Sequence, residues 1–212
     1  MMAKICKIYD VLIIGAGAAG LFLAANLRGK SVAVLEKNAT PGKKILASGG
    51  GRCNVTNRHI DASNYLGDAN FVKNILKNLD FKDVLKFFGE LKFNEQKQNQ
   101  FFCDSGAKDV LGVLLKRARQ SGAQIFCGVC VKGARKILTD ENGQILDVSP
   151  AQNRGENLTD FETKFDRCEQ NLNEIFEVVA ENGDKFYAKN LVVASGGLSY
   201  KSLGASNIGY EI

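Results

Sequence analysis

The stretch YDVLIIGAGAAGL, residues 9–21, decides the fold because it joins a buried strand to a helix through a glycine turn. Its first part, YDVLIIG, is a continuous apolar run, which is typical of a strand buried on both faces. The segment AGAAGLFLAANLRG is rich in alanine and predicts a helix that ends near Gly29. The segment SVAVLE, residues 31–36, is a second apolar strand. The sequence therefore predicts a βαβ unit with parallel strands and a right-handed crossover.

Three glycines in this turn have the spacing GxGxxG, namely Gly15, Gly17 and Gly20, and Glu36 follows 21 residues after Gly15. A strand, this turn, a helix and a terminal acid make up the Rossmann fingerprint of dinucleotide-binding proteins. Gly15 permits the tight turn, Gly17 lets the backbone approach a diphosphate, and Gly20 lets the helix pack closely on the strand. The helix N-terminus attracts the diphosphate, and Glu36 is expected to accept hydrogen bonds from the adenosine ribose. We therefore predict a site for an ADP-containing dinucleotide.

The segment after Glu36 bears on which dinucleotide binds. A simple NAD dehydrogenase would continue through alternating helices and parallel strands. Here KNATPGKKILASGGGRCNVTN, residues 37–57, is irregular, basic and rich in glycine. A loop that runs along the diphosphate toward a flavin has this character, so the segment favours FAD. An NAD-dependent dehydrogenase without flavin stays an alternative.

Composition and charge narrow the class of protein. The 212 residues are 45% hydrophobic and 24% charged, as in soluble globular proteins, and no apolar run reaches the roughly 18 residues of a membrane span. Residues 1–60 hold nine Lys or Arg and two acids, whereas residues 139–185 hold four and twelve. A basic first segment suits an anionic cofactor. We expect no membrane partner, since no apolar run is long enough to span a membrane, and no nucleic-acid partner, since there is no aromatic-basic motif. Six cysteines are too few for a disulfide scaffold and indicate a cytoplasmic protein with reduced thiols.

The rest of the chain predicts a mixed α/β organisation. The expected elements before residue 132 are short helices near 69–79 and 81–91, a hairpin within 92–104, a helix over 107–121 with Ser105 as candidate N-cap, and one strand in AQIFCGVCV, residues 123–131. From residue 133 to residue 190 the pattern becomes antiparallel. It has hairpins around Asn142-Gly143 and Asn182-Gly183, for which we expect type I′ turns, and a polar loop over 150–172. The segment NLVVASGG, residues 190–197, predicts a return to a buried strand followed by glycines.

Three motifs, DVLIIGAGAAGL, PGKKILASGGGRCNVTN and LVVASGGLSYKSLGASNIGY, resemble the bacterial FAD-dependent oxidoreductases of the aminoacetone oxidase-like, BaiN/YhiN-type family. The resemblance implies a glutathione-reductase-like FAD-binding Rossmann-type fold, with a parallel sheet and an antiparallel β meander. It also implies an oxidoreductase in which a hydride passes through FAD to oxygen or an organic acceptor, with NAD(P)H as a candidate donor and a small-molecule substrate.

The same resemblance implies which residues hold FAD, although it names no catalytic side chain. They are Gly15, Gly17, Ala18, Ala19, Gly20, Glu36, Lys37, Lys44, Gly49, Gly50, Gly51, Arg52, Cys53, Asn54, Val131, Ala194, Ser195, Gly196 and Gly197. The loop over 49–54 is expected beside the flavin, the backbone near Val131 beside the adenine, and residues 194–197 in a second dinucleotide-facing turn. Arg52 is expected to donate to phosphate or to reduced flavin, with a surface ion pair as the alternative.

Other reactive side chains in the sequence give weaker signals. Cys53 is expected to be a packing residue, because CNVTNRH lacks the second cysteine that a flavin-linked disulfide reductase needs. The CGVC motif, residues 127–130, lies on a predicted strand where its two cysteines would point to opposite faces, so we expect no metal site. His59 is the one histidine and is a candidate acid-base group.

Members of this family are considerably longer than the present chain. The resemblance therefore implies an incomplete FAD-binding domain over 1–212, with a Rossmann-type part at 1–132, a β meander at 133–190 and a return strand at 191–212. The substrate domain and the last flavin-contacting strand would be missing, and a partner chain is a candidate source of them. A non-catalytic remnant and a subunit of a split flavoenzyme stay open as alternatives.

Overall fold

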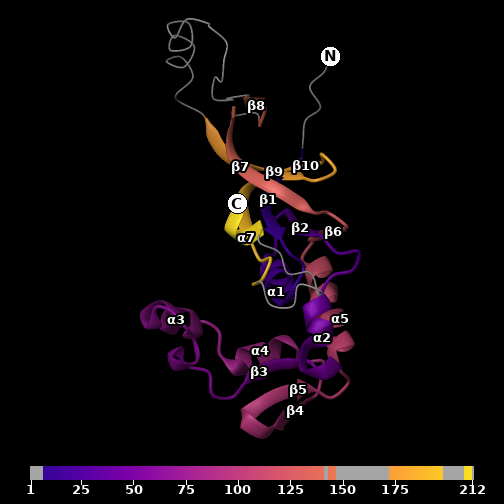
Figure 1. Ribbon diagram of the computed structural model, residues 1–212, viewed down its shortest axis with the longest axis vertical. Helices are drawn as coiled ribbons and strands as arrows, with labels where there is room; N and C mark the ends of the chain where they lie inside the picture. Colours follow the sequence, from indigo (N-terminus) through magenta and orange to yellow (C-terminus); the bar gives the residue numbers. More distant parts are fainter. Residues whose placement is uncertain (1–6, 141–142, 147–171, 198–207, 212) are drawn as a thin grey trace, which may run out of the picture. The chain divides into compact units, whose positions relative to one another are not determined.

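The computed structural model of the protein describes residues 7–140, 143–146, 172–197 and 208–211 (Figure 1). The chain divides into two compact units, one made of Met1–Pro41 with Ser121–Ile212 and the other of Gly42–Gln120. Apart from Leu172, the polar loop predicted over 150–172 lies outside the described residues. In the part of the chain that the structure describes, no helix is long and apolar enough to cross a membrane.

The first unit is built on one seven-stranded sheet with the strand order β6-β2-β1-β10-β9-β7-β8. Its parallel strands are β1 (Ile8–Ile14), β2 (Val32–Glu36), β6 (Gln124–Cys127) and β10 (Lys185–Val193). Its antiparallel strands are β7 (Val131–Thr139), β8 (Ile145–Leu146) and β9 (Asn173–Ala180). Helices α1 (Ala18–Asn26) and α7 (Ile208–Glu211) belong to the same unit. The predicted fold, a parallel Rossmann-type sheet continued by an antiparallel meander, is confirmed.

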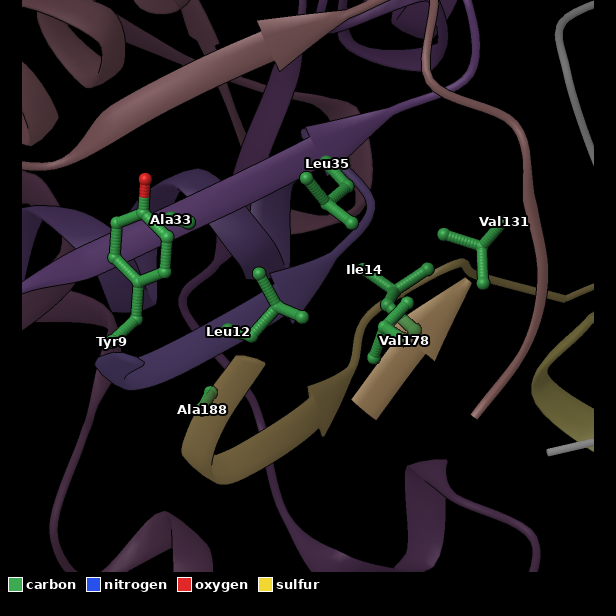
Figure 2. Packing of buried hydrophobic residues seen from close by; sticks show 8 residues of the cluster. All are labelled: Tyr9, Leu12, Ile14, Ala33, Leu35, Val131, Val178 and Ala188. Atoms are coloured by element: carbon green, nitrogen blue, oxygen red, sulfur yellow. The ribbon is translucent and has the colours of Figure 1, made fainter. Parts of the chain in front are cut away.

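The core of this unit lies where the parallel and antiparallel parts of the sheet meet (Figure 2). Leu12 and Ile14 of β1 pack with Leu35 of β2 and with Val178 of β9, and each is at most 4% exposed. Burial of such an aliphatic side chain contributes about 1.5–3 kcal/mol to folding. The continuous apolar runs in the sequence therefore correspond to strands that are covered on both faces.

One strand predicted from the sequence is two strands in the structure. The segment AQIFCGVCV breaks after Cys127, because Gly128 has a φ of +75° and its N–H donates to the carbonyl of Asn38 at 3.0 Å. Strand β7 then starts at Val131. The two cysteines of CGVC therefore lie on either side of a turn and not on one strand, so the expectation that places them on opposite faces of a strand was wrong.

Strand β10 is continuous from Lys185 to Val193, so the predicted boundary at residue 190 falls inside it. Its first half pairs antiparallel with β9, whereas it pairs parallel with β1 along most of its length. This strand joins the meander to the Rossmann-type part and carries the chain to residues 194–197.

Both predicted hairpins form, but the turn at Asn182-Gly183 is not of type I′. The N–H of Gly183 donates to Ala180 and the N–H of Ala180 donates to Asp184, at 3.0 and 2.9 Å. Gly183 has a φ of +88°, whereas Asn182 has a negative φ. This is a three-residue loop in which a type I turn is followed by a left-handed glycine. Gly143 donates to Asp140 in the same way at 3.0 Å, and Asn142 lies outside the described residues.

The second unit combines a small antiparallel sheet with helices. The sheet has the order β3-β5-β4, with β3 at Asn54–Asn57, β5 at Gln100–Cys103 and β4 at Phe93–Gln96. The helices are α2 (Lys43–Ala47), α3 (Ala69–Leu76), α4 (Phe81–Phe87) and α5 (Ala107–Gln120), with short 3-10 turns η1 (Ser48–Gly51), η2 (Ala62–Asn64) and η3 (Lys97–Asn99).

The predicted hairpin and helices of this unit are present, and the helices near 69–79 and 81–91 end three or four residues earlier than expected. The side chains of Asp68 and Asp80 cap α3 and α4 by accepting backbone N–H bonds. Helix α5 begins at Ala107, so Ser105 is one residue too early to be its N-cap. The Ser105 hydroxyl lies 3.4 Å from the sulfur of Cys103 instead.

Candidate functional site

The glycine turn after β1 is held by close backbone contacts. Gly15 has a φ of +108°, and its N–H donates to the carbonyl of Leu35 at 2.7 Å. A Cβ at Gly15 would lie 2.5 Å from the carbonyl oxygen of Ala194, and a Cβ at Gly20 would lie 1.9 Å from the carbonyl oxygen of Gly15. Real Cβ atoms essentially never approach within 3.0 Å. Glycine is therefore required at both positions by the protein's own backbone.

Gly17 is different, because a Cβ built there would meet no atom within 4 Å. Gly17 is the N-cap residue of α1 and provides no side-chain cap, and the next two residues, Ala18 and Ala19, are exposed. The start of α1 thus presents bare backbone, with the positive end of the helix dipole, toward open space. This is the arrangement that binds a diphosphate, so the turn fits a dinucleotide.

Glu36 fastens this turn to the loop after β2. It is 8% exposed, and its Oε2 accepts the backbone N–H of Ala16 at 3.0 Å. Its Oε1 accepts the backbone N–H of Asn38 at 2.9 Å and the side-chain amide of Asn38 at 2.6 Å. A carboxylate oxygen has more than one acceptor position, so the predicted bond to a ribose hydroxyl stays compatible with this role. The part played by Asn38 could not be found from the sequence, since the fingerprint does not include it.

A second turn, residues 194–197, lies against the first. The N–H of Ala194 donates to the carbonyl of Ile14 at 2.8 Å, and the Ala194 carbonyl is the atom that excludes a side chain at Gly15. Gly196 has a φ of +75°, Gly196 and Gly197 are exposed, and Ser195 is half-buried. The structure therefore brings both predicted dinucleotide-facing turns together at the carboxyl ends of neighbouring parallel strands, where open α/β sheets bind their ligands.

Two other predicted contacts of this unit lie near the same strands. Lys37 directly follows Glu36 and is exposed. Val131 begins β7, and its side chain is 8% exposed in the core cluster that Figure 2 shows. Its backbone pairs with Ala180 of β9. The expected contact of this backbone with adenine stays a prediction.

In the second unit, the three glycines of ILASGGGRCN have left-handed backbones, with φ values of +58°, +66° and +89°. A Cβ at Gly49 would lie 2.6 Å from the ring of Phe102, so this glycine is required by a side chain of the protein. A Cβ at Gly50 or Gly51 would meet nothing within 4 Å. The last two glycines are therefore the ones whose bare backbone is open to a ligand. The predicted position of this loop beside the flavin stays a prediction.

Arg52 is held in one orientation by its neighbours. Its guanidinium lies 4.6 Å from the centre of the Phe102 ring, Nε donates to the carbonyl of Gly49 at 3.3 Å, and Nη1 donates to Gln96 at 3.1 Å. Within the described residues Arg52 makes no ion pair, so the surface ion pair weighed from the sequence is not seen there. Phe102 and Gln96 are supporting residues that the sequence did not reveal, because they lie more than 40 residues away along the chain.

The neighbours of Arg52 in the motif have unlike surroundings. Cys53 is 5% exposed, and this burial, with a smaller contribution from Cys103, raises the pKa of its thiol to about 11. A thiol with this pKa is protonated at neutral pH and is a poor nucleophile, which fits the expected packing role. Asn54 is exposed at the start of β3, and Lys44 is half-buried on α2.

The remaining reactive side chains form no recognisable centre. Cys127 is exposed and Cys130 is partly buried. No group of three potential metal ligands occurs among the residues that the structure describes. His59 is exposed, and its backbone N–H donates to the side chain of Asn57 at 2.9 Å.

Comparison with known proteins agrees with this geometry. Residues 9–155 match the family model described as the HI0933-like protein Rossmann domain. The chain belongs to the HI0933-like Rossmann domain family. The family resemblance found in the sequence, BaiN/YhiN-type flavoproteins, agrees with this assignment.

Two curated relatives and one solved structure illustrate the similarity. The ribosomal RNA dihydrouridine synthase of Haemophilus influenzae is 34% identical over 95% of this chain and 43% of its own length. The 3-dehydro-bile acid delta(4,6)-reductase of Clostridium scindens is 31% identical over 94% of this chain and 42% of its own length. The 3-ketosteroid-delta4-(5alpha)-dehydrogenase of Rhodococcus jostii has the same fold, with a TM-score of 0.54, 16% identity, and coverage of 94% of this chain and 48% of that one.

The family, the fold and the open turn at Gly17 together assign FAD as the cofactor. The chain spans less than half of the length of the curated relatives described above.

Proposed function

We propose that the protein is the FAD-binding part of a reductase that adds a hydride, and a proton from solvent, to a carbon–carbon double bond conjugated to a carbonyl group. The observation that carries the flavin assignment is the turn at Gly17, where open backbone and a helix N-terminus lie at the carboxyl end of β1. In this proposal the organic acceptor, and not oxygen, receives the hydride.

The names of two relatives support this choice of acceptor. One relative is named for making dihydrouridine and the other for reducing a 3-dehydro-bile acid at delta(4,6). Dihydrouridine is uridine whose 5,6 double bond, conjugated to a ring carbonyl, has been reduced. A delta(4,6) double-bond system next to a 3-oxo group is likewise conjugated to a carbonyl. The shared chemistry is thus a polarised double bond in a ring.

The residues of this chain would hold and orient the cofactor. Gly17 and the N-terminus of α1 would bind the diphosphate, and Glu36 would bind the ribose while it fixes the turn through Ala16. When bound, the flavin supplies the hydride. We propose NAD(P)H as the source of its electrons.

Anaerobic flavin reoxidation tests the proposal. The full-length protein is loaded with FAD, reduced with NADPH or dithionite, and mixed with uridine or a 3-oxo-4-ene steroid. The matched controls are dihydrouridine and the saturated 3-oxo steroid, which lack the double bond. We expect the yellow oxidised flavin to return only with the unsaturated compounds. Return with oxygen alone, and with neither unsaturated compound, would overturn the proposal in favour of an oxidase.

A further inference from the structure

Two grooves lie side by side in the second unit, and of the residues expected above to hold FAD only Asn54 lines either of them. The first, which we call the ring groove, has a volume of about 690 Å³ and lies between β3, the residues around η2, and helices α3 and α4. The second, which we call the lysine groove, has a volume of about 630 Å³ and lies between η2 and α3. Ile60 and Leu76 line both grooves, so the two are adjacent. Both volumes are within the range of ligand sites.

The ring groove has an apolar wall and an aromatic ring that the fold leaves exposed. Ile75 and Leu79 on its wall are 51% and 38% exposed, and Tyr65 is 49% exposed. No residue of α3 is buried, although the helix carries several large apolar side chains. Exposed apolar side chains that gather along one groove mark an interaction site, and a groove of this volume can accept a ligand.

Among the described residues, three polar side chains on the same groove are not held by hydrogen bonds. The side chains of Asn54, His59 and Tyr65 make no hydrogen bond to any other described residue. The Asn54 amide both donates and accepts, as the edge of a nucleobase does, and Tyr65 provides a face on which a base can stack. The carboxylate of Asp80 also lines the groove and accepts the N–H of Asp83. An apolar wall, a stacking ring and an amide suit a flat heterocycle.

The lysine groove supplies positive charge next to this ring site. Lys73 and Lys77, four residues apart on and just after α3, line it, and neither is in an ion pair with a described residue. Asp61 lines the same groove; its carboxylate accepts the N–H of Ser63 at 2.6 Å and also attracts the Lys73 ammonium. Two ammonium groups beside a ring site match a base attached to a phosphate.

The second unit as a whole carries an excess of positive charge, which suits an anionic ligand. Residues 42–120 hold fourteen Lys or Arg and eight Asp or Glu, whereas the rest of the chain holds fourteen and fifteen. The positive excess of the protein therefore belongs to the unit that carries the grooves. The segments 1–60 and 139–185 do not coincide with this unit, so their charges do not reveal its excess.

From this juxtaposition we propose that the two grooves bind a single-stranded RNA segment, with one unstacked base in the ring groove against Tyr65 and the phosphodiester at Lys73 and Lys77. The inference rests on the proposed function, because it identifies the acceptor ring as a uracil base within a strand. It departs from the expectation of no nucleic-acid partner. A steroid would cover the apolar wall of the ring groove but has no anionic group for the two lysines of the lysine groove.

Fluorescence anisotropy with a labelled short oligouridine tests this without flavin chemistry. Tyr65→Ala is expected to weaken binding by the full-length protein about tenfold, the size of one lost base stack. Phe71→Ala is the matched control, since Phe71 is 65% exposed on α3 but lines neither groove. Lys73→Gln and Lys77→Gln are each expected to lower the slope of log affinity against log salt by about 0.7, and Lys108→Gln on α5 serves as their control.

Three results would overturn the inference: no oligouridine binding, equal loss in Tyr65→Ala and Phe71→Ala, or a 3-oxo steroid that binds at Tyr65 while oligouridine does not. The proposed function is tested separately. If free uridine or the steroid reoxidises the flavin while Tyr65→Ala binds oligouridine like the parent protein, only the groove assignment fails. If oligouridine binding depends on Tyr65 while neither the two unsaturated compounds nor oligouridine itself reoxidises the flavin, the RNA site stands and the reductase assignment fails.

Discussion

Gly20→Ala and Gly17→Ala form a matched pair that separates a structural glycine from a ligand-binding one. Alanine favours a helix interior over glycine by about 1 kcal/mol, so without a clash Gly20→Ala would stabilise α1. The structure predicts the opposite sign. The new methyl group would lie 1.9 Å from the carbonyl oxygen of Gly15, against a limit of 3.0 Å, so the backbone has to move by about 1 Å. Overpacking of this kind costs about 1–3 kcal/mol.

Gly17→Ala should behave in the reverse manner. Its methyl group would meet no protein atom within 4 Å, and the φ of −88° is allowed for alanine. Alanine is a poorer N-cap than glycine, so we expect a loss of under about 1 kcal/mol in stability. The methyl group would, however, occupy the space of the diphosphate. We expect FAD affinity to fall at least tenfold, which corresponds to about 1.4 kcal/mol.

Urea unfolding followed by circular dichroism measures stability without a tryptophan, which the sequence lacks. Titration with FAD, followed by quenching of free flavin fluorescence, measures affinity. If Gly20→Ala is as stable as the parent protein, the close packing of α1 on the turn is wrong. If Gly17→Ala binds FAD with unchanged affinity, the diphosphate does not lie at this turn.

Three further predictions follow from individual side chains. Glu36→Gln places an amide donor against backbone donors in a buried site, so urea unfolding should show a loss of about 1–3 kcal/mol in the free energy of unfolding. Equal stability would contradict the role of Glu36 in joining Ala16 to Asn38. Burial raises the pKa of Cys53 to about 11, so at pH 8 iodoacetamide should label the exposed Cys127 at least ten times faster than Cys53. Peptide mass spectrometry measures the two rates, and comparable rates would mean that Cys53 is accessible. The backbone N–H of Ser31 and other donors lower the pKa of Asp10, so the ionised carboxylate stabilises the fold above about pH 4 and this stabilisation is lost as the pH falls. The difference in urea midpoint between the parent protein and Asp10→Asn should therefore shrink in acid. A difference that stays constant with pH would contradict the stabilising role of Asp10.

The parts of the fold that the sequence predicted are those set by local pattern. The apolar runs of β1 and β2 and the alanine-rich α1 are readable because strand and helix periodicity act over a few residues. The GxGxxG turn could be predicted because the motif itself specifies a tight turn, a backbone open to a diphosphate and a close contact between helix and strand. The break at Gly128 was missed, because it depends on a bond to Asn38 about 90 residues earlier in the chain.

In the candidate site, too, the sequence predicted which residues matter but not the roles that depend on distant partners. The sequence indicated which glycines matter, but it could not distinguish Gly49, which faces Phe102, from Gly50 and Gly51, which face open space. It named Glu36 as a ribose ligand and could not reveal that the carboxylate also holds Ala16. Such roles depend on partners brought close only by the fold.

The contact between Gly15 and Ala194 has a consequence for how the protein is made. Strand β1 is synthesised long before one of its two neighbours, β10, which starts about 170 residues further along the chain. During that interval the contiguous residues 42–120 have the chance to fold as a unit of their own. One edge of β1 therefore stays unpaired until residues 185–194 have been synthesised. We therefore expect FAD capture to follow the synthesis of β10, and slow translation of the segment before β10 would lengthen the period in which this edge is open to misassembly.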